Sequence, residues 1–246
     1  MKFLVVMRGS CNRFENIRYI YDNYLLKIKN PLLDNGHTID CMINTYNDND
    51  KYFEKFEELY NPIKVFRMDP CKYQYLNFYY GMINITPFIK DYDKIIFLRF
   101  DICYKINIMK WNIFNDKGIF FPFKDYNDEY FKKMNTHGDC IIVIDNIYFD
   151  QVYEAIHESI QYYEFNNKIS EHIPFGFDVD GTLHHFSNIL LCKYNKFPIY
   201  YVIDGYYISS TFYKWFITNE VLNPLYIMMS RDYYGDISDY LLLERL

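Results

Sequence analysis

The chain has 246 residues, half of them hydrophobic, with a formal net charge of -6 and a pI near 5.5. This length allows one large domain or two small ones. The acidic balance, with no run of Lys and Arg, excludes a general nucleic-acid-binding surface.

No stretch approaches the roughly 20 apolar residues of a membrane span, and Met1–Met7 is too short and too soon followed by Arg8 for a signal segment. We therefore expect a cytoplasmic protein without a membrane span. The 28 Tyr and 22 Phe residues, with abundant Ile, Asn and Lys, are typical of an AT-rich genome. A large DNA virus, and hence a host cytoplasm, fits this bias, as does a similarly biased microbe.

The six cysteines are widely spaced and form no CxxC pair. This spacing excludes an obvious zinc site and does not resemble a compact disulfide framework. We expect buried thiols in a reducing compartment. The positions are Cys11, Cys41, Cys71, Cys103, Cys140 and Cys192.

Strand and helix patterns alternate through the first part of the chain. Apolar strands are expected at 3–7, 39–45, 63–68 and 95–100, and helices at about 15–29, 50–60 and 71–85. This order predicts an α/β fold with a largely parallel sheet and helices on both faces.

The pattern changes after Asp101. Further strands are expected at 118–123 and 140–145, followed by an amphipathic helix at about 148–165 and an irregular region from 166 onward. With no repeat or linker, the sequence predicts one domain over 1–246.

Arg8, Gly9 and Arg13 lie in the loop that follows the first strand. Glycine permits a tight turn and close backbone approach, and arginine suits contact with phosphate oxygens. The loop contains neither GxGxxG nor GxxxxGK[ST], so neither nucleotide fingerprint applies. Two solvated arginines in an ordinary loop remain the alternative.

Arg99 and Asp101 follow the continuous apolar run 95–98. Such a run is typical of a strand covered on both faces, and the carboxyl end of such a strand is where open α/β sheets bind ligands. A strand-end carboxylate can hold Mn²⁺ or Mg²⁺ when a diphosphate supplies further oxygens. An ordinary Arg–Asp ion pair is the alternative.

The stretch 92–102 resembles the central element of GT-A-type glycosyltransferases, which use nucleotide sugars. Their pattern is Tyr-Asp, an apolar strand, then Asp-x-Asp; Tyr92-Asp93, the apolar run and Asp101 follow it, while Arg99 replaces the first Asp. An R-x-D variant of this kind resembles viral and polysaccharide-synthesis glycosyltransferase-like proteins. The resemblance in element order spans about residues 1–165, with specific motifs over about a dozen residues.

The resemblance implies a GT-A-like, Rossmann-like, mostly parallel mixed sheet and transfer of a sugar from a UDP- or GDP-linked donor to a glycan hydroxyl. Within the single domain, 1–110 would be the nucleotide-binding half and 111–246 the acceptor-side half. Asp101 would hold Mn²⁺ or Mg²⁺, and Arg99 leaves this metal dependence open because an arginine can itself balance diphosphate charge. Asn44 and Thr45, with Tyr46, would face the nucleotide base. Asp139, after His137 and Gly138, would contact the donor sugar.

A second acidic segment, Asp178-Val-Asp180-Gly-Thr182, admits two functions. It resembles the nucleophile motif of haloacid-dehalogenase-like phosphatases, although that motif should end an early core strand. In a glycosyltransferase, Asp178 or Asp180 would be the base that takes the acceptor proton. His184 or His185, with His185 preferred, would complete the metal site. The residues do not choose between inverting and retaining transfer, and a non-catalytic nucleotide-sugar-binding scaffold is a third possibility.

Overall fold

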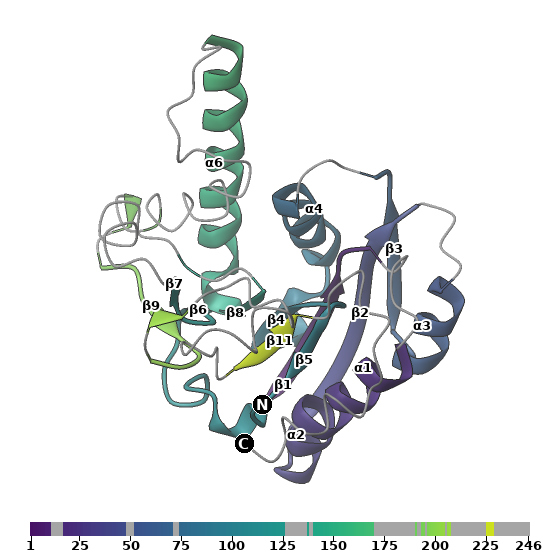
Figure 1. Cartoon of the computed structure of the whole chain (residues 1–246). Coiled ribbons are helices and arrows are strands. Elements are labelled where there is room, and N and C mark those ends of the chain that lie inside the picture. The colour runs from purple at the N-terminus through teal and green to yellow at the C-terminus, as the bar shows by residue number, and fades with distance from the viewer. Residues whose placement is uncertain are drawn as a thin grey trace.

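A computed structural model of the chain describes residues 1–10, 17–47, 52–70, 74–125, 137, 140–169, 190, 193–194, 196–204, 206–207 and 225–228. Its centre is a seven-stranded sheet in the order β3-β2-β1-β4-β8-β6-β9 (Figure 1). The strands are β1 (Lys2–Arg8), β2 (Thr38–Tyr46), β3 (Lys64–Met68), β4 (Lys94–Arg99), β6 (Ile119–Phe121), β8 (Ile141–Asp145) and β9 (Ile199–Tyr201).

Two short strand pairs accompany this sheet. β5 (Ile102–Tyr104) pairs antiparallel with β11 (Tyr226–Met228), and β7 (Lys124–Asp125) pairs parallel with β10 (Tyr206–Tyr207). The first pair brings a distant segment of the chain beside the residues that directly follow β4.

The sheet is mixed because a single strand runs against the others. β1 is parallel to β2 and β4, β2 is parallel to β3, and β6 is parallel to β9. β8 is antiparallel to both of its neighbours, β4 and β6. The α/β class and the mostly parallel, mixed sheet expected from the sequence are therefore confirmed, and the architecture is consistent with a Rossmann-like GT-A fold.

Helices cover both faces of the sheet, as the alternating pattern predicts (Figure 1). In β1, Phe3, Val5 and Met7 join the core under α1 and α3, whereas Leu4 and Val6 join the core under α4 and α6. This alternation follows from the two-residue period of a strand. The helices are α1 (Ile17–Tyr24), α2 (Asn30–Asp34), α3 (Phe53–Tyr60), α4 (Gln74–Ile85) and α6 (Phe149–Ile169).

The first helical segment runs further than the sequence pattern predicts. A π-helical turn, Leu25–Lys29, joins α1 to α2, and the Asn30 N–H donates to the Leu25 carbonyl. Pro31 then lies at the start of α2. Proline has no N–H, so it cannot continue the hydrogen-bond ladder of the preceding turn, and α2 begins at this break. Three 3₁₀ turns, Ile89–Asp91, Ile108–Lys110 and Asn146–Tyr148, complete the described helical elements.

Cys41, Cys103 and Cys140 are buried thiols, as predicted, and the other cysteines lie outside the described residues. Burial raises the pKa of the Cys41 thiol to about 12. Within the same residues, no helix has both the length and the apolar character needed to cross a bilayer.

Candidate functional site

The candidate site lies at the carboxyl ends of the three central strands β2, β1 and β4. Arg8, near the end of β1, pairs in register with Asn44 of β2 on one side and with Arg99 of β4 on the other. Residues paired across adjacent strands point to the same face of a sheet. The two arginines predicted separately from the sequence are therefore direct neighbours.

The boundary between β1 and β4 is the point where the chain changes direction across the sheet. From β1 the connections proceed outward to β2 and β3, and the chain then returns to place β4 on the other side of β1. Open α/β sheets bind ligands outside the carboxyl ends of the strands at such a switch point. Arg8 and Arg99 stand on its two sides.

Arg8 is a buried cation. It is 2 % exposed, and its guanidinium carbon lies 5.5 Å from the centre of the Phe78 ring of α4. A guanidinium over an aromatic face gains a modest electrostatic attraction, which is larger where water is excluded. Gly9, the next residue, has φ +110°, a conformation that favours glycine, as the sequence predicts for a tight turn.

Asn44 and Thr45 are both used inside the fold. The Asn44 side chain donates to the Asn77 carbonyl at 3.0 Å and accepts from Asn84 at 2.9 Å, which ties β2 to α4. The Thr45 hydroxyl donates to the Gly9 carbonyl at 2.8 Å. Both residues are fully buried. Their contacts tie the ends of β1 and β2 to each other and to α4, and the base contact expected from the sequence stays a prediction.

Arg99 and Asp101 form a side-on ion pair. Arg99 Nε donates to one carboxylate oxygen at 2.8 Å, and Nη2 donates to the other. The side chains are only 11 % and 16 % exposed. Paired contacts between a guanidinium and a carboxylate are among the strongest charge-assisted hydrogen bonds, so this pair fixes the orientation of both groups.

The ion pair bears directly on the expected metal site. Mn²⁺ and Mg²⁺ require carboxylate or other oxygen ligands, but both oxygens of Asp101 already accept hydrogen bonds from Arg99. No group of three or more Asp, Glu, His or Cys side chains that could hold a metal occurs among the described residues. Among the described residues Asp101 thus lacks a group of neighbouring metal ligands, and its metal role stays a prediction. His185, the second expected ligand, lies outside them.

The segment that leads into β8 reaches the same edge of the sheet, since Ile141 pairs with Leu98. His137 is 2 % exposed and stacks on Phe121, with ring centres 4.4 Å apart. Its Nδ1 lies 3.2 Å from the Tyr201 hydroxyl. His137 thus anchors the ends of β6 and β9, a role that the sequence did not indicate.

Several predicted site residues lie outside the described residues. They are Arg13, Asp139, Asp178, Asp180, His184 and His185. The Asp178–Thr182 segment is among them.

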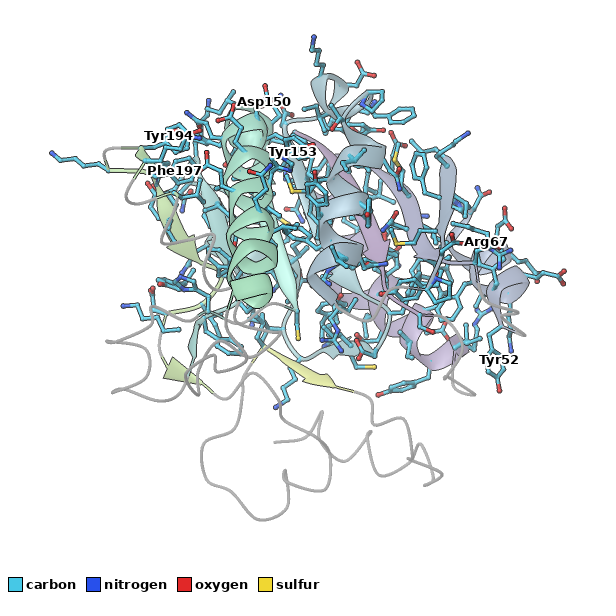
Figure 2. All side chains as sticks on the ribbon, turned by 90° about the horizontal axis from the view of Figure 1, so that it is seen from above. Tyr52, Arg67, Asp150, Tyr153, Tyr194 and Phe197 are labelled. Atoms are coloured by element: carbon cyan, nitrogen blue, oxygen red, sulfur yellow. The ribbon has the colours of Figure 1, made fainter. Side chains whose placement is uncertain are left out.

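Arg67, which the sequence analysis did not single out, pairs in register with Thr45, so its side chain lies at this edge but on the opposite face of the sheet from Arg8. Its guanidinium lies 4.2 Å from the centre of the Phe53 ring of α3. Figure 2 shows Arg67 and Tyr52 on the α3 side of the molecule, away from α6, where Tyr153, Tyr194 and Phe197 lie. The sequence pattern that could have identified Arg67 is a charged residue between the apolar residues of Val65–Met68.

The fold and site define a class of protein, an α/β protein with a cationic site at the switch point of a mixed sheet. No protein-family profile and no curated protein matches the chain. One similar solved structure is a protein from Desulfovibrio desulfuricans G20 named "putative nucleotide-diphospho-sugar transferase". It shares 11 % identity over 86 % of this chain and 83 % of its own, with a TM-score of 0.45.

Proposed function

We propose that the chain is a nucleotide-sugar-dependent glycosyltransferase, which moves a sugar from a nucleoside diphosphate to a hydroxyl acceptor. The observation that supports this proposal is the register pairing of Arg8 with Arg99 on the two sides of the switch point. The mixed sheet with one antiparallel strand agrees with the GT-A resemblance of residues 92–102.

The chemistry follows from charge. When a sugar leaves a nucleoside diphosphate, negative charge grows on the diphosphate oxygens. Guanidinium groups already oriented by the fold stabilise that charge most in the transition state. Arg8 is held against Phe78, and Arg99 is held by Asp101, so both cations are positioned before the donor arrives.

The remaining roles come from the sequence. Asp178 or Asp180 would take the proton of the acceptor hydroxyl as it attacks the sugar. Asp139 would contact the donor sugar, and Arg13 would add positive charge near the phosphates. UDP- and GDP-linked sugars are the proposed donors, and a glycan is the proposed acceptor.

The first test is thermal unfolding of the purified protein with UDP-, GDP-, CMP- and dTDP-linked sugars, followed by a transfer assay with any donor that binds. A ligand that binds the native state raises the unfolding midpoint by mass action. We expect one nucleotide class to raise the midpoint. Arg99→Gln should reduce this rise, and Arg18→Gln, at an arginine with a 67 % exposed side chain on α1, should not.

The outcomes separate the candidate functions. Binding followed by sugar transfer supports the proposal. Binding without transfer to any acceptor, or hydrolysis of the donor, would favour a binding scaffold. No binding by any donor, together with phosphate release that Asp178→Asn abolishes, would favour the phosphatase.

A further inference from the structure

Asp101 is the residue directly before β5, so the contacts that hold β5 also set the position of the Arg99–Asp101 ion pair. We propose that Asn23 of α1 is a positioning residue of the candidate site. Its side-chain amide holds β5 along one edge, while β11 holds the other edge. This inference rests on the proposed function, in which Asp101 keeps Arg99 in place for the donor.

Asn23 binds the backbone of Tyr104 as a neighbouring strand would. Its Nδ2 donates to the Tyr104 carbonyl at 3.0 Å, and its Oδ1 accepts from the Tyr104 N–H at 2.6 Å. Both residues are buried. A buried backbone group without a partner is costly, so the two bonds to Asn23 are what makes this edge of β5 stable inside the protein.

The opposite edge of β5 is held by the distant segment that contains β11. The Lys105 N–H donates to the Leu225 carbonyl at 3.0 Å, so these two residues form a hydrogen-bonded pair of the antiparallel ladder. Hydrogen-bonded and non-hydrogen-bonded pairs alternate along such a ladder, so Tyr104 and Tyr226 form a non-hydrogen-bonded pair. The N–H and C=O of Tyr104 therefore point away from β11, toward Asn23. Figure 1 shows β11 beside β5.

Asn23 is a costly residue for its place in the sequence. Asparagine is a weak helix former, because its side chain competes for backbone hydrogen bonds. Here it lies near the end of α1, directly before the π-helical turn, and it is buried. Its contact with Tyr104, 81 residues later in the chain, accounts for an amide at this position.

Asp101 thus lies between two fixed points. On one side, the Phe100 N–H donates to the Arg8 carbonyl at 3.4 Å, which ties the end of β4 to β1. On the other side, β5 is held by Asn23 and β11. A displacement of about 1 Å at a catalytic group can lower a rate about a hundredfold. Asn23 therefore acts on the site through the backbone of β5, without touching the donor.

The test replaces Asn23 by leucine, which has the same branched shape and neither hydrogen-bonding group. Hydrogen exchange, followed by mass spectrometry, reports on peptides that cover 99–105 and 225–228. We expect both peptides to exchange about tenfold faster or more in Asn23→Leu, because two buried backbone groups lose their partner. The kcat of sugar transfer should fall about tenfold or more, and the KM for the donor should change less, because Arg99 acts on charge that grows in the transition state.

The outcomes separate the inference from the proposed function. Faster exchange together with a lower kcat supports the inference. Unchanged exchange of the 99–105 peptide in a folded Asn23→Leu variant would overturn it, and so would faster exchange with an unchanged kcat. If the parent binds no nucleotide sugar and transfers no sugar, the proposed function fails. The exchange of the 99–105 peptide then decides alone whether Asn23 fixes Asp101.

Controls separate positioning from a general loss of structure. Asn35→Leu makes the same substitution at the end of α2, where the Asn35 side chain donates to the Pro31 carbonyl at 2.8 Å. It should leave both the exchange of 99–105 and the kcat as in the parent. Asn23→Ala removes the same two bonds with a smaller and more helix-favouring side chain, and it gives the test if Asn23→Leu does not fold. All measurements are made well below the unfolding midpoint of each variant, so that a lower kcat does not merely report unfolded protein.

Discussion

Lys94 and Asp145 face each other across β4 and β8, with Lys94 Nζ 2.8 Å from both carboxylate oxygens. Their side chains are 3 % and 7 % exposed. Lys94 also donates to the Asp116 carbonyl at 3.1 Å, and Asp145 accepts from the Gly118 N–H at 2.8 Å. This buried ion pair therefore joins β4 and β8 to the residues just before β6.

Asp145→Asn should destabilise the protein by about 3 kcal/mol or more, because Lys94 would keep a buried charge without its counter-charge. The free energy of unfolding in urea measures the effect. Asp22→Asn breaks an exposed pair with Arg18 on α1 and should cost less than about 1 kcal/mol. Equal, small losses in the two variants would show that the buried pair does not stabilise the register of β8.

The direction of β8 shows what the sequence could not predict. The run Ile141–Ile144 indicates a buried strand, but an apolar run contains no information on whether the strand is parallel or antiparallel. That direction is accompanied by a contact between Lys94 and Asp145, which are 51 residues apart. The parallel strands β1 to β4 were predictable because each is separated from the next by a helical pattern.

The candidate site also has one part that the sequence could predict and one part that it could not. The positions of Arg8 and Arg99 at strand ends could be predicted from the apolar runs that precede them. Their adjacency could not, because it depends on β4 lying beside β1 and not beside β3. The sequence also could not show that the Asn44 side chain is hydrogen-bonded to α4. A polar residue at a strand end has the same sequence pattern whether it contacts a helix or a ligand.

Gly118 allows a close approach between β6 and β9. A Cβ added there would lie 2.3 Å from the Pro198 carbonyl oxygen, which belongs to the backbone and cannot rotate away. The Ile119 N–H donates to the same oxygen at 3.0 Å. Gly118→Ala should therefore force the two strands apart and cost about 2 kcal/mol.

Gly81→Ala is a matched control for this prediction. The same substitution in α4 would place Cβ 3.3 Å from the Asn44 side chain, which is a milder contact. The better helix propensity of alanine offsets part of the cost, so the free energy of unfolding should change by less than about 1 kcal/mol. A Gly118→Ala variant as stable as Gly81→Ala would contradict the close approach of β6 and β9.

Lys105 directly follows β5, and its N–H donates to the Leu225 carbonyl at 3.0 Å. Burial lowers the pKa of the Lys105 side chain to about 8, from 10.5 in water. Between these two values the unfolded chain binds more protons at this position than the native protein does. The free energy of unfolding contributed by Lys105 therefore rises with pH across this window, and its cost is fully present below about pH 8.

Lys105→Met keeps a long unbranched side chain and removes the charge. The variant should be more stable than the parent at pH 7, and its advantage should shrink as the pH rises from 8 to 10. Urea unfolding of both proteins at each pH measures this difference, in which the other titrating groups largely cancel. Lys110→Met makes the same substitution at an exposed lysine and is the control for replacing a lysine by methionine. A difference between Lys105→Met and the parent that stays constant with pH would mean that the Lys105 ammonium keeps its full hydration in the folded protein.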